Sequence, residues 1–380
     1  MNSAKKSMSD FSKPTFKVHW RLCQGISDNL RTRKSILDNS SISDIAIGEK
    51  IKFCQTAENL GFDSVLIDFG YNKPDPVLLA TAIGLQTERI KFIIACRSGL
   101  LSPTLFVQQL NTLSQLIPNR FSLNIVAGHT PAEQKAYGDM LSHDERYART
   151  GEYLEISKML CTSQHSVDYS GKYYRISEKD LNVSSGSAKC IRSEFWPELF
   201  IAGSSSQAQS LAKKNSAIWM SLVQPAVSMA GDIKQMIAAG NEVGIRLSVI
   251  CRETREKAIA AAQQLVAESR SNSAEGIDIE SIFVKRSDSE GIKNISKLAV
   301  ESTDHWHDHC LWTGAVETHG APSIALVGSA EDIALSIFEY YKMGVSHFIF
   351  SGWPQLEEMK IFGREVLPIF YKFKQHSYAL

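Results

Sequence analysis

The chain has 380 residues, of which 43% are hydrophobic and 22% are charged, as is ordinary for a soluble globular protein. Its 41 basic residues balance its 41 acidic residues, so bulk charge favours neither nucleic acid nor a membrane surface as a partner. The length permits one large domain or two to three small ones, and α/β barrels are the usual large single domain.

Taken in chain order, short apolar strands alternate with helices. In the first half the predicted strands are 16–22, 63–68, 90–96 and 121–128, and the predicted helices are 45–62, 75–89, 102–120 and one that opens at Ser142. In the second half the predicted strands are 198–203, 217–222, 245–252 and 347–352, and the predicted helices are 204–215, 226–240, 254–269, 330–344 and 356–370.

Strands that are apolar along their whole length, each returning through a helix, belong in a parallel sheet covered on both faces. Eight such units predict a (β/α)8 TIM barrel. A doubly wound open sheet is the alternative that this pattern leaves open.

Two segments break the rhythm. Residues 165–181 alternate like a hairpin around Ser-Gly, and residues 270–312 are long, polar and poorly periodic. Long insertions in a barrel are commonly lids or binding loops. We therefore expect one barrel domain over 15–375, with 270–325 as a mobile lid at the carboxyl-terminal face of the strands.

Compartment and targeting signals point to a cytoplasmic protein. The seven cysteines are scattered without a CxxC pair, which indicates reduced thiols and neither a disulfide framework nor a zinc site. No apolar run reaches the ~18–20 residues that a membrane span needs. The polar start MNSAKKSMSDFSKP has no apolar core, so we expect no signal peptide and a flexible segment over 1–14.

The stretch SHDERYARTGEYLE, residues 142–155, predicts a helix start with unusual side chains. Ser142 is a good N-cap, and acidic residues follow it in the first turn. His143 and Tyr147 stand four apart on one face of that turn, where helix N-termini attract anions. The alternative is a packed tyrosine beside a surface histidine.

A second helix start offers the same chemistry. In AGSSSQAQ, residues 202–209, Gly203 and three serines lie between a strand and a helix. Backbone N–H groups, hydroxyls and the positive end of the helix dipole would cradle a phosphate there. The alternative is a plain N-cap, which needs one serine. The two helix starts are candidates to converge on one phosphate.

Other catalytic motifs find little support. HWHDHC (305–310) holds three histidines and a cysteine, but their spacing is wrong for one helix face and no partner HxxxH or CxxC exists. We therefore interpret it as part of the lid and expect no metal. The chain has no GxGxxG, no GxxxxGK[ST] and no GxSxG, so nicotinamide, P-loop and serine-hydrolase functions are unsupported.

Several passages, in a common order over roughly residues 45–370, carry a resemblance to a known family. They are AENLGFDSVLID, SPTLFVQQLNTLSQLIPNRFSLNIVAG, HDERYARTGEYLEI, FIAGSSSQAQSLA, GIRLSVICRET, LWTG with ALVG, and FIFSGWPQLEE. Together they resemble the bacterial luciferase-like flavin-dependent monooxygenases, most closely the alkanesulfonate monooxygenase branch. That family is a (β/α)8 barrel that uses reduced FMN supplied by a separate flavin reductase.

The resemblance implies the cofactor contacts. His143 and Tyr147 match the family's HxxRY motif, which faces the flavin and its phosphate, and Ser204 and Ser205 match its Gly-Ser-Ser phosphate loop. On this reading the expected anion is the FMN phosphate. Asp68, at the end of the second strand, and Cys96, with Arg97 after it, match further positions near the flavin.

The substrate side departs from the alkanesulfonate pattern. Arg246 is retained, but Ser248 stands where those enzymes have a histidine. His319 stands where they have a lid arginine, and Trp353 where they have a tyrosine. A family cysteine falls near Lys73. A bulkier and more aromatic pocket with one retained arginine suggests a larger substrate that is still anionic.

The resemblance thus implies a two-component FMNH2-dependent monooxygenase, which inserts one oxygen atom of O2 through a C4a-(hydro)peroxyflavin. The substrate would be an organosulfonate or a secondary-metabolite intermediate. Arg246 would supply positive charge, His319 an acid or base, and Trp353 an aromatic wall. The structural alternatives are an arginine paired with a carboxylate inside the barrel, a surface histidine and a packed tryptophan.

Two other functions remain open for the same fold. One is an F420-dependent oxidoreductase that moves hydride without oxygen, and the other is a non-catalytic flavin-binding paralogue. Family habit suggests a homodimer or homotetramer, with the flavin reductase as a transient partner. The sequence indicates no nucleic-acid or membrane partner.

Overall fold

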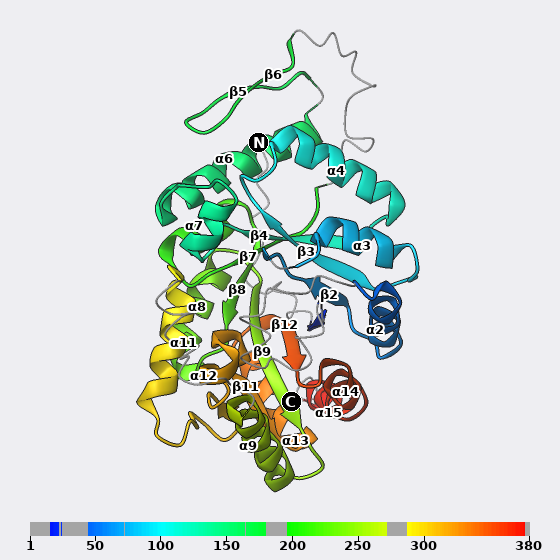
Figure 1. The fold of residues 1–380 in the computed structure, drawn as a ribbon, viewed down its shortest axis with the longest axis vertical. Helices are drawn as coiled ribbons and strands as arrows, with labels where there is room; N and C mark the ends of the chain where they lie inside the picture. The colour runs from blue at the N-terminus through cyan, green and yellow to red at the C-terminus, as the bar shows by residue number, and fades with distance from the viewer. Residues whose placement is uncertain are drawn as a thin grey trace, which may run out of the picture.

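The protein is seen in a computed structural model that describes residues 16–22, 24, 45–71, 73–163, 165–179, 196–271 and 287–376. Eight parallel strands close into a barrel (Figure 1). They are β1 (Lys17–Arg21), β2 (Ser64–Ile67), β3 (Lys91–Arg97), β4 (Phe121–Val126), β7 (Leu199–Ala202), β8 (Ile218–Leu222), β9 (Val243–Cys251) and β12 (Val345–Gly352). β1 pairs with both β2 and β12, and β8 pairs with β9, which closes the ring. The predicted TIM barrel is confirmed, and the open sheet is excluded.

Helices follow the strands and cover the outside of the barrel (Figure 1). They are α2 (Ile47–Asn59), α3 (Pro76–Gly84), α4 (Pro103–Leu116), α5 (Pro131–Ala136), α6 (His143–Thr162), α7 (Ser206–Lys214), α8 (Ala226–Ala238), α9 (Arg255–Ser271), α13 (Ala330–Lys342), α14 (Gln355–Ile361) and α15 (Leu367–His376). The short α5 was not predicted. The predicted last helix is interrupted by a π-turn over Phe362–Val366 and continues beyond its predicted end. Among the described helices, none combines the length and apolar character of a membrane crossing.

The two irregular segments differ in outcome. The hairpin forms as predicted, from antiparallel β5 (Asp168–Ser170) and β6 (Arg175–Ser177). In the predicted lid, the described part contains α11 (Glu290–Glu301), β10 (Leu311–Trp312), α12 (Val316–His319) and a 3₁₀ turn (Ala321–Ser323), and β11 (Ala325–Gly328) begins at its last residue. Residues 1–14, predicted to be flexible, and residues 272–286 of the lid lie outside the described residues.

The helix α11 corrects the expectation of a poorly periodic segment. Ile292, Ile295 and Ala299 recur at helical spacing, and the latter two are buried. Ser289 caps the helix by accepting a bond from the backbone of Ile292 at 3.4 Å. Polar residues on both sides dilute this short apolar stripe, which is why the sequence pattern was missed.

Alternation along the strands separates two apolar layers. Inside the barrel the apolar layer consists of Leu66, Ile93, Phe200, Ile218, Met220 and Ile349. The larger cluster between strands and helices takes the other face, including Phe92, Ile94 and Cys96 of β3. Since successive strand residues point to opposite faces, Arg97 lies on the barrel side of β3 and Cys96 on the helix side.

A chain of three polar side chains lies at the amino-terminal end of the barrel. His19 Nε2 lies 3.1 Å from His347 Nδ1, and His347 Nε2 lies 2.5 Å from Glu242 Oε2. Both histidines are buried. Burial lowers the pKa of His19 well below its usual value, and nearby His347 and Lys17 act in the same direction. His19 is therefore neutral in the folded protein.

We expect acidification from pH 7.5 to 5.5 to destabilise the barrel through His19. Its pKa is lower in the folded state than the ~6.5 of an unfolded chain, so its contribution is complete above that value and is lost as the pH falls below it. The free energy of unfolding in urea should fall by about 1 kcal/mol or more. His19→Gln should shrink this fall, whereas His165→Gln, at an exposed position, should not. Equal pH dependence in all three proteins would contradict the assignment.

Candidate functional site

The start of α6 and the loop between β7 and α7 meet at Tyr147. Gly203 has φ +143°, and a Cβ there would lie 3.0 Å from Tyr147 Oη and 2.8 Å from Ala208 Cβ. Burial raises the pKa of the Tyr147 hydroxyl, while a hydrogen bond with the Ser205 side chain opposes the shift. The hydroxyl thus stays protonated at neutral pH and is a hydrogen-bond donor held against the loop backbone.

The other predicted phosphate contacts lie in the same place. The His143 ring packs on Tyr147 with centroids 4.9 Å apart. Ser205 caps α7 by accepting a bond from Ala208 N at 3.3 Å, and Ser204 Oγ lies 3.3 Å from Ser221 Oγ. The structure therefore brings together the four predicted residues from two helix starts.

A side-chain bridge ties these two helix starts to each other. Asp144 Oδ1 lies 2.9 Å from His143 Nδ1 and accepts a bond from Gln207 Nε2 at 3.0 Å. Asp144 belongs to α6 and Gln207 to α7. The convergence that was predicted for a shared anion is thus present in the fold.

A third element, which the sequence did not reveal, covers this region. A Cβ on Gly291 of α11 would lie 3.2 Å from Ser204 Oγ. Asp288, just before α11, donates its backbone N–H to the carbonyl of His129 at 2.9 Å. The start of α11 therefore lies against the loops that follow β4 and β7.

Arg146 is the residue that joins these pieces, and sequence analysis did not single it out. Its side chain is 2% exposed. It donates to the carbonyls of Ala127 at 3.1 Å, Leu141 at 2.9 Å and Gly128 at 3.4 Å, and it pairs with Asp288. Arg146 is the arginine of the HxxRY motif, which was the signal that the sequence offered for this role.

Arg146→Met should lower the free energy of unfolding by about 2–4 kcal/mol, because it leaves buried carbonyls and the Asp288 carboxylate without their donor. Chemical denaturation measures the loss. Arg270→Met is the matched control, since Arg270 pairs with Glu317 on the surface at 2.6 Å. The control should cost less than about 1 kcal/mol. Similar losses in both variants would remove Arg146 from its organising role.

At the carboxyl end of β2, Asp68 is the centre of an ion cluster. It pairs with Arg21, with Lys73 at 3.0 Å and with Arg246 at 3.6 Å. Burial by itself would raise the pKa of Asp68, but Lys73, Arg21 and Arg246 together hold it well below its usual value. Gln24 fixes the Asp68 backbone through two hydrogen bonds of 2.9 and 3.0 Å.

This cluster changes two interpretations. The structural alternative for Arg246, an ion pair with a carboxylate inside the barrel, is observed. Among the described residues, the contacts of Asp68 lead to these cations and not to Tyr147 or Ser205. Three cations sharing one carboxylate give this cluster an excess of positive charge.

Cys96 points away from the barrel, so the structure does not support the prediction that it contacts the cofactor. Burial, with a smaller effect from Asp75, raises the pKa of its thiol to about 12. The side chain of its neighbour Arg97 points into the barrel instead. Arg97 donates to Gln134 at 3.0 Å and to Glu133 at 2.8 Å, and its guanidinium stacks on Phe69 at 4.7 Å.

His319 and Trp353 form a buried aromatic pair, with centroids 5.2 Å apart. His319 is 1% exposed, which excludes the surface-loop alternative. Its Nδ1 lies 2.7 Å from Thr318 Oγ1 and its Nε2 lies 3.4 Å from Ser269 Oγ. The histidine side chain is thereby oriented from both ring nitrogens.

The side chain of Ser248 is covered by the chain itself. Its hydroxyl lies 2.9 Å from Ser351 Oγ and donates to the Pro322 carbonyl at 3.1 Å. The 3₁₀ turn Ala321–Ser323 therefore closes over the ends of β9 and β12. A substrate contact at this position is blocked while the turn stays in place.

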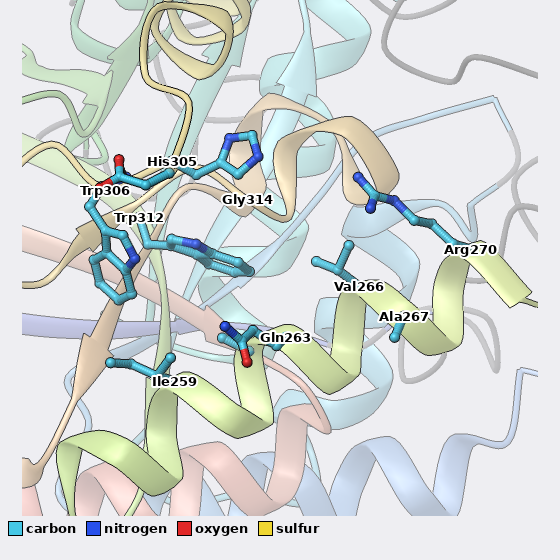
Figure 2. A pocket seen from close by; sticks show the side chains of 11 residues that line it. Ile259, Gln263, Val266, Ala267, Arg270, His305, Trp306, Trp312 and Gly314 are labelled. Carbon is cyan, nitrogen blue, oxygen red and sulfur yellow. Dashed lines mark hydrogen bonds between the residues drawn. The ribbon is translucent and has the colours of Figure 1, made fainter.

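A separate cavity of about 280 Å³ lies outside the barrel (Figure 2). One wall is the face of α9 from Ile259 to Arg270, and the other is the segment from Asp304 to Gly314 with Trp306 and Trp312. None of the predicted site residues lines it. His305 of the HWHDHC stretch faces this cavity.

The family model of luciferase-like monooxygenases matches residues 29–347. The chain belongs to the luciferase-like monooxygenase family. Its members are flavin-dependent monooxygenases and related oxidoreductases, which use FMN or F420. The match gives the family without selecting the alkanesulfonate branch.

Three solved structures share the fold of this luciferase-like protein. EDTA monooxygenase from Chelativorans sp. BNC1 is 18% identical over 94% of both chains, with a TM-score of 0.71. Riboflavin lyase, solved with modified FMN and riboflavin, is 16% identical over 96% of this chain and 92% of that chain, with a TM-score of 0.69. An F420-dependent secondary alcohol dehydrogenase, in complex with an F420–acetone adduct, is 16% identical over 94% and 99%, with a TM-score of 0.63. At these identities the likeness shows the fold alone.

Proposed function

We propose that this chain is the oxygenase of a two-component monooxygenase, which uses O2 and reduced FMN supplied by a separate flavin reductase. The observation that carries the proposal is the meeting of Tyr147, Gly203 and Ser205 at two joined helix starts. Helix N-termini with free hydroxyls and closely approaching backbone bind phosphate. A flavin mononucleotide carries its phosphate at one end, as such a site requires.

The residues present fit a flavin. The Gly203 cradle would be filled by any Cβ. Asn124 of β4 lies on the barrel side by strand alternation, and its Oδ1 is buried without a hydrogen-bond partner among the described residues. A buried acceptor of this kind fits the N–H of a planar ring system. When bound, reduced FMN supplies the electrons that activate O2.

The chain's own residues have distinct tasks in this proposal. Tyr147, Ser204 and Ser205 bind the phosphate. Arg246 offers positive charge to a substrate anion at the barrel mouth. His319, oriented by Thr318 and Ser269, holds or moves a proton, and Trp353 packs against the substrate.

We further propose a substrate that carries an anionic group, either an organosulfonate or a secondary-metabolite intermediate. The positive ion cluster around Asp68 supports the anion. The covered Ser248 and the His319–Trp353 pair favour the secondary-metabolite class, since the sulfonate-side histidine and arginine are both replaced.

We also propose that the chain forms a homo-oligomer, with its interface on an exposed apolar face of two helices. Leu78 of α3 and Leu85, just after that helix, are 72% and 55% exposed, and Leu105 and Leu116 of the neighbouring α4 are also exposed. Exposed leucines on two adjacent helices are typical of a subunit contact. Sedimentation of the full chain, with Leu78→Glu as the test variant, measures whether this face holds a dimer.

The second candidate is an F420-dependent oxidoreductase, because enzymes of that kind share the fold. Rapid mixing of the protein and photoreduced FMN with oxygenated buffer, followed by flavin absorbance, separates the two. We expect the protein to change the reoxidation rate of FMN, and Tyr147→Phe to return it towards that of free FMN. Reoxidation identical to free FMN, together with saturable binding of F420, would select the second candidate. Binding of either flavin without turnover would indicate a non-catalytic paralogue.

A further inference from the structure

We propose that His309, Cys310 and Asp332 form a binding site for a divalent metal ion, with zinc as the ion that these ligands suit best. The three residues lie outside the barrel, where the turn before β10 meets the start of α13. Their ligand atoms all lie within 4.8 Å of one another. The site shares no residue with the proposed flavin contacts, so the proposal stands independently of the proposed function.

The spacing of the donors is close to that of a tetrahedral site. Zinc bonds of about 2.0 Å to nitrogen or oxygen and about 2.3 Å to sulfur place neighbouring donors roughly 3.3–3.6 Å apart. His309 Nε2 already lies 3.1 Å from Asp332 Oδ1. With every separation below 4.8 Å, an ion needs the Cys310 sulfur to move by only about 1 Å.

The surrounding backbone fixes two of the ligands. Asp332 Oδ2 accepts bonds from the backbone and the hydroxyl of Ser329 at 3.0 and 2.9 Å, which leaves Oδ1 directed at His309. Asp308 Oδ1 accepts the N–H groups of Cys310 and Leu311 at 2.8 and 2.6 Å. The turn that presents His309 and Cys310 is therefore rigid.

The charges balance when the ion is bound. Zinc binding displaces the thiol proton of Cys310 to solvent, and the resulting thiolate and the Asp332 carboxylate neutralise the two positive charges of the ion. Burial raises the pKa of the Cys310 thiol, and Arg255, whose Nη1 lies 3.8 Å from Sγ, acts in the opposite direction and would donate to the thiolate once the ion is bound. A neutral metal site tolerates this arginine, and water fills the fourth position at the exposed His309 edge.

This inference revises the expectation of no metal in HWHDHC. The other two histidines of that stretch take no part, because His305 faces the outer cavity (Figure 2) and His307 Nε2 lies 2.9 Å from Thr313 Oγ1. The partner of His309 and Cys310 is Asp332, which stands 23 residues after His309 on another element. A bound ion would link the turn before β10 to α13 and would so hold one edge of the predicted lid in place.

The test is titration of zinc into the full chain after treatment with a chelator. We expect one equivalent of Zn2+ to bind and to raise the melting temperature, as a ligand of the folded state must. Substituted Co2+ should show a thiolate charge-transfer band, because the sulfur is a ligand. His309→Ala should weaken Zn2+ binding more than about tenfold. Even the loss of a residue that only hydrogen-bonds to a metal ligand weakens metal binding by about tenfold or more.

The control is His307→Ala, which changes the same stretch without removing a ligand and should leave zinc affinity unchanged. Cys310→Ser should abolish the cobalt charge-transfer band, but Cys310 is buried and this variant tests folding as well. His309, whose side chain is 68% exposed, therefore gives the deciding result. Absence of zinc binding, or equal affinity in wild type and His309→Ala, would overturn the proposal.

Discussion

Replacing Gly203 by alanine should weaken the binding of reduced FMN about 10- to 100-fold, equivalent to about 1.4–2.8 kcal/mol, while the barrel stays folded. The added Cβ would lie 3.0 Å from Tyr147 Oη and 2.8 Å from Ala208 Cβ, at a backbone φ of +143° that side chains rarely adopt. Relief of this crowding should move the Tyr147 hydroxyl away from the proposed phosphate position. Anaerobic calorimetry with photoreduced FMN measures the affinity, and circular dichroism verifies the fold.

Two further variants separate the local geometry from general damage. Gly231→Ala, on α8, meets no atom within 4 Å and should bind FMN like the wild type. Tyr147→Phe removes the hydroxyl that the new Cβ would meet. Its effect and that of Gly203→Ala should therefore combine to less than their sum, because both remove the same interaction. Strictly additive losses would place Gly203 and Tyr147 at independent sites.

The sequence allowed prediction of the whole barrel because each strand is buried on both faces. Segments such as 92–96 are apolar along their length, and serine caps such as Ser142 mark where the helices begin. What the pattern missed were short or diluted elements. The six residues of α5 hold less than two turns, and α11 is a short apolar stripe between polar segments.

Part of the site was predictable for the same local reason. The local pattern of a helix N-terminus was enough to predict Tyr147, His143 and the serines after Gly203, because that pattern depends only on neighbours in the chain. The bond from Arg146 to Asp288 joins residues 142 positions apart, and no local pattern encodes it. Cys96 and Arg97 are consecutive, so a one-residue choice of strand face decided which of them points into the barrel.

The ion cluster around Asp68 also joins residues far apart in the chain, so no local sequence pattern predicted it. It leads to a second prediction with a large expected effect. Asp68→Asn should lower the free energy of unfolding by about 3–5 kcal/mol, because it leaves buried cations without their carboxylate. Arg246→Gln should cost less than about 1 kcal/mol. In that variant Asp68 keeps its ion pairs with Arg21 and Lys73. The Arg246 side chain is 25% exposed, and its distance of 3.6 Å from Asp68 is longer than that of the other two cations. Urea unfolding of both variants and of the double variant gives the two losses and their coupling.

The same pair of variants separates a structural role of Arg246 from a role in anion binding. With octanesulfonate as a probe anion, Arg246→Gln should weaken binding more than about tenfold, in line with the loss of a charge-assisted hydrogen bond. Asp68→Asn should strengthen it, since the positive charge of Arg246 is then no longer shared with a carboxylate. Lys257→Gln, at an exposed ion pair with Glu253, should change neither stability nor anion affinity. If Arg246→Gln lost stability as heavily as Asp68→Asn and left the affinity for octanesulfonate unchanged, Arg246 would serve the fold alone, and the substrate anion would have to be bound by Arg21 or Lys73.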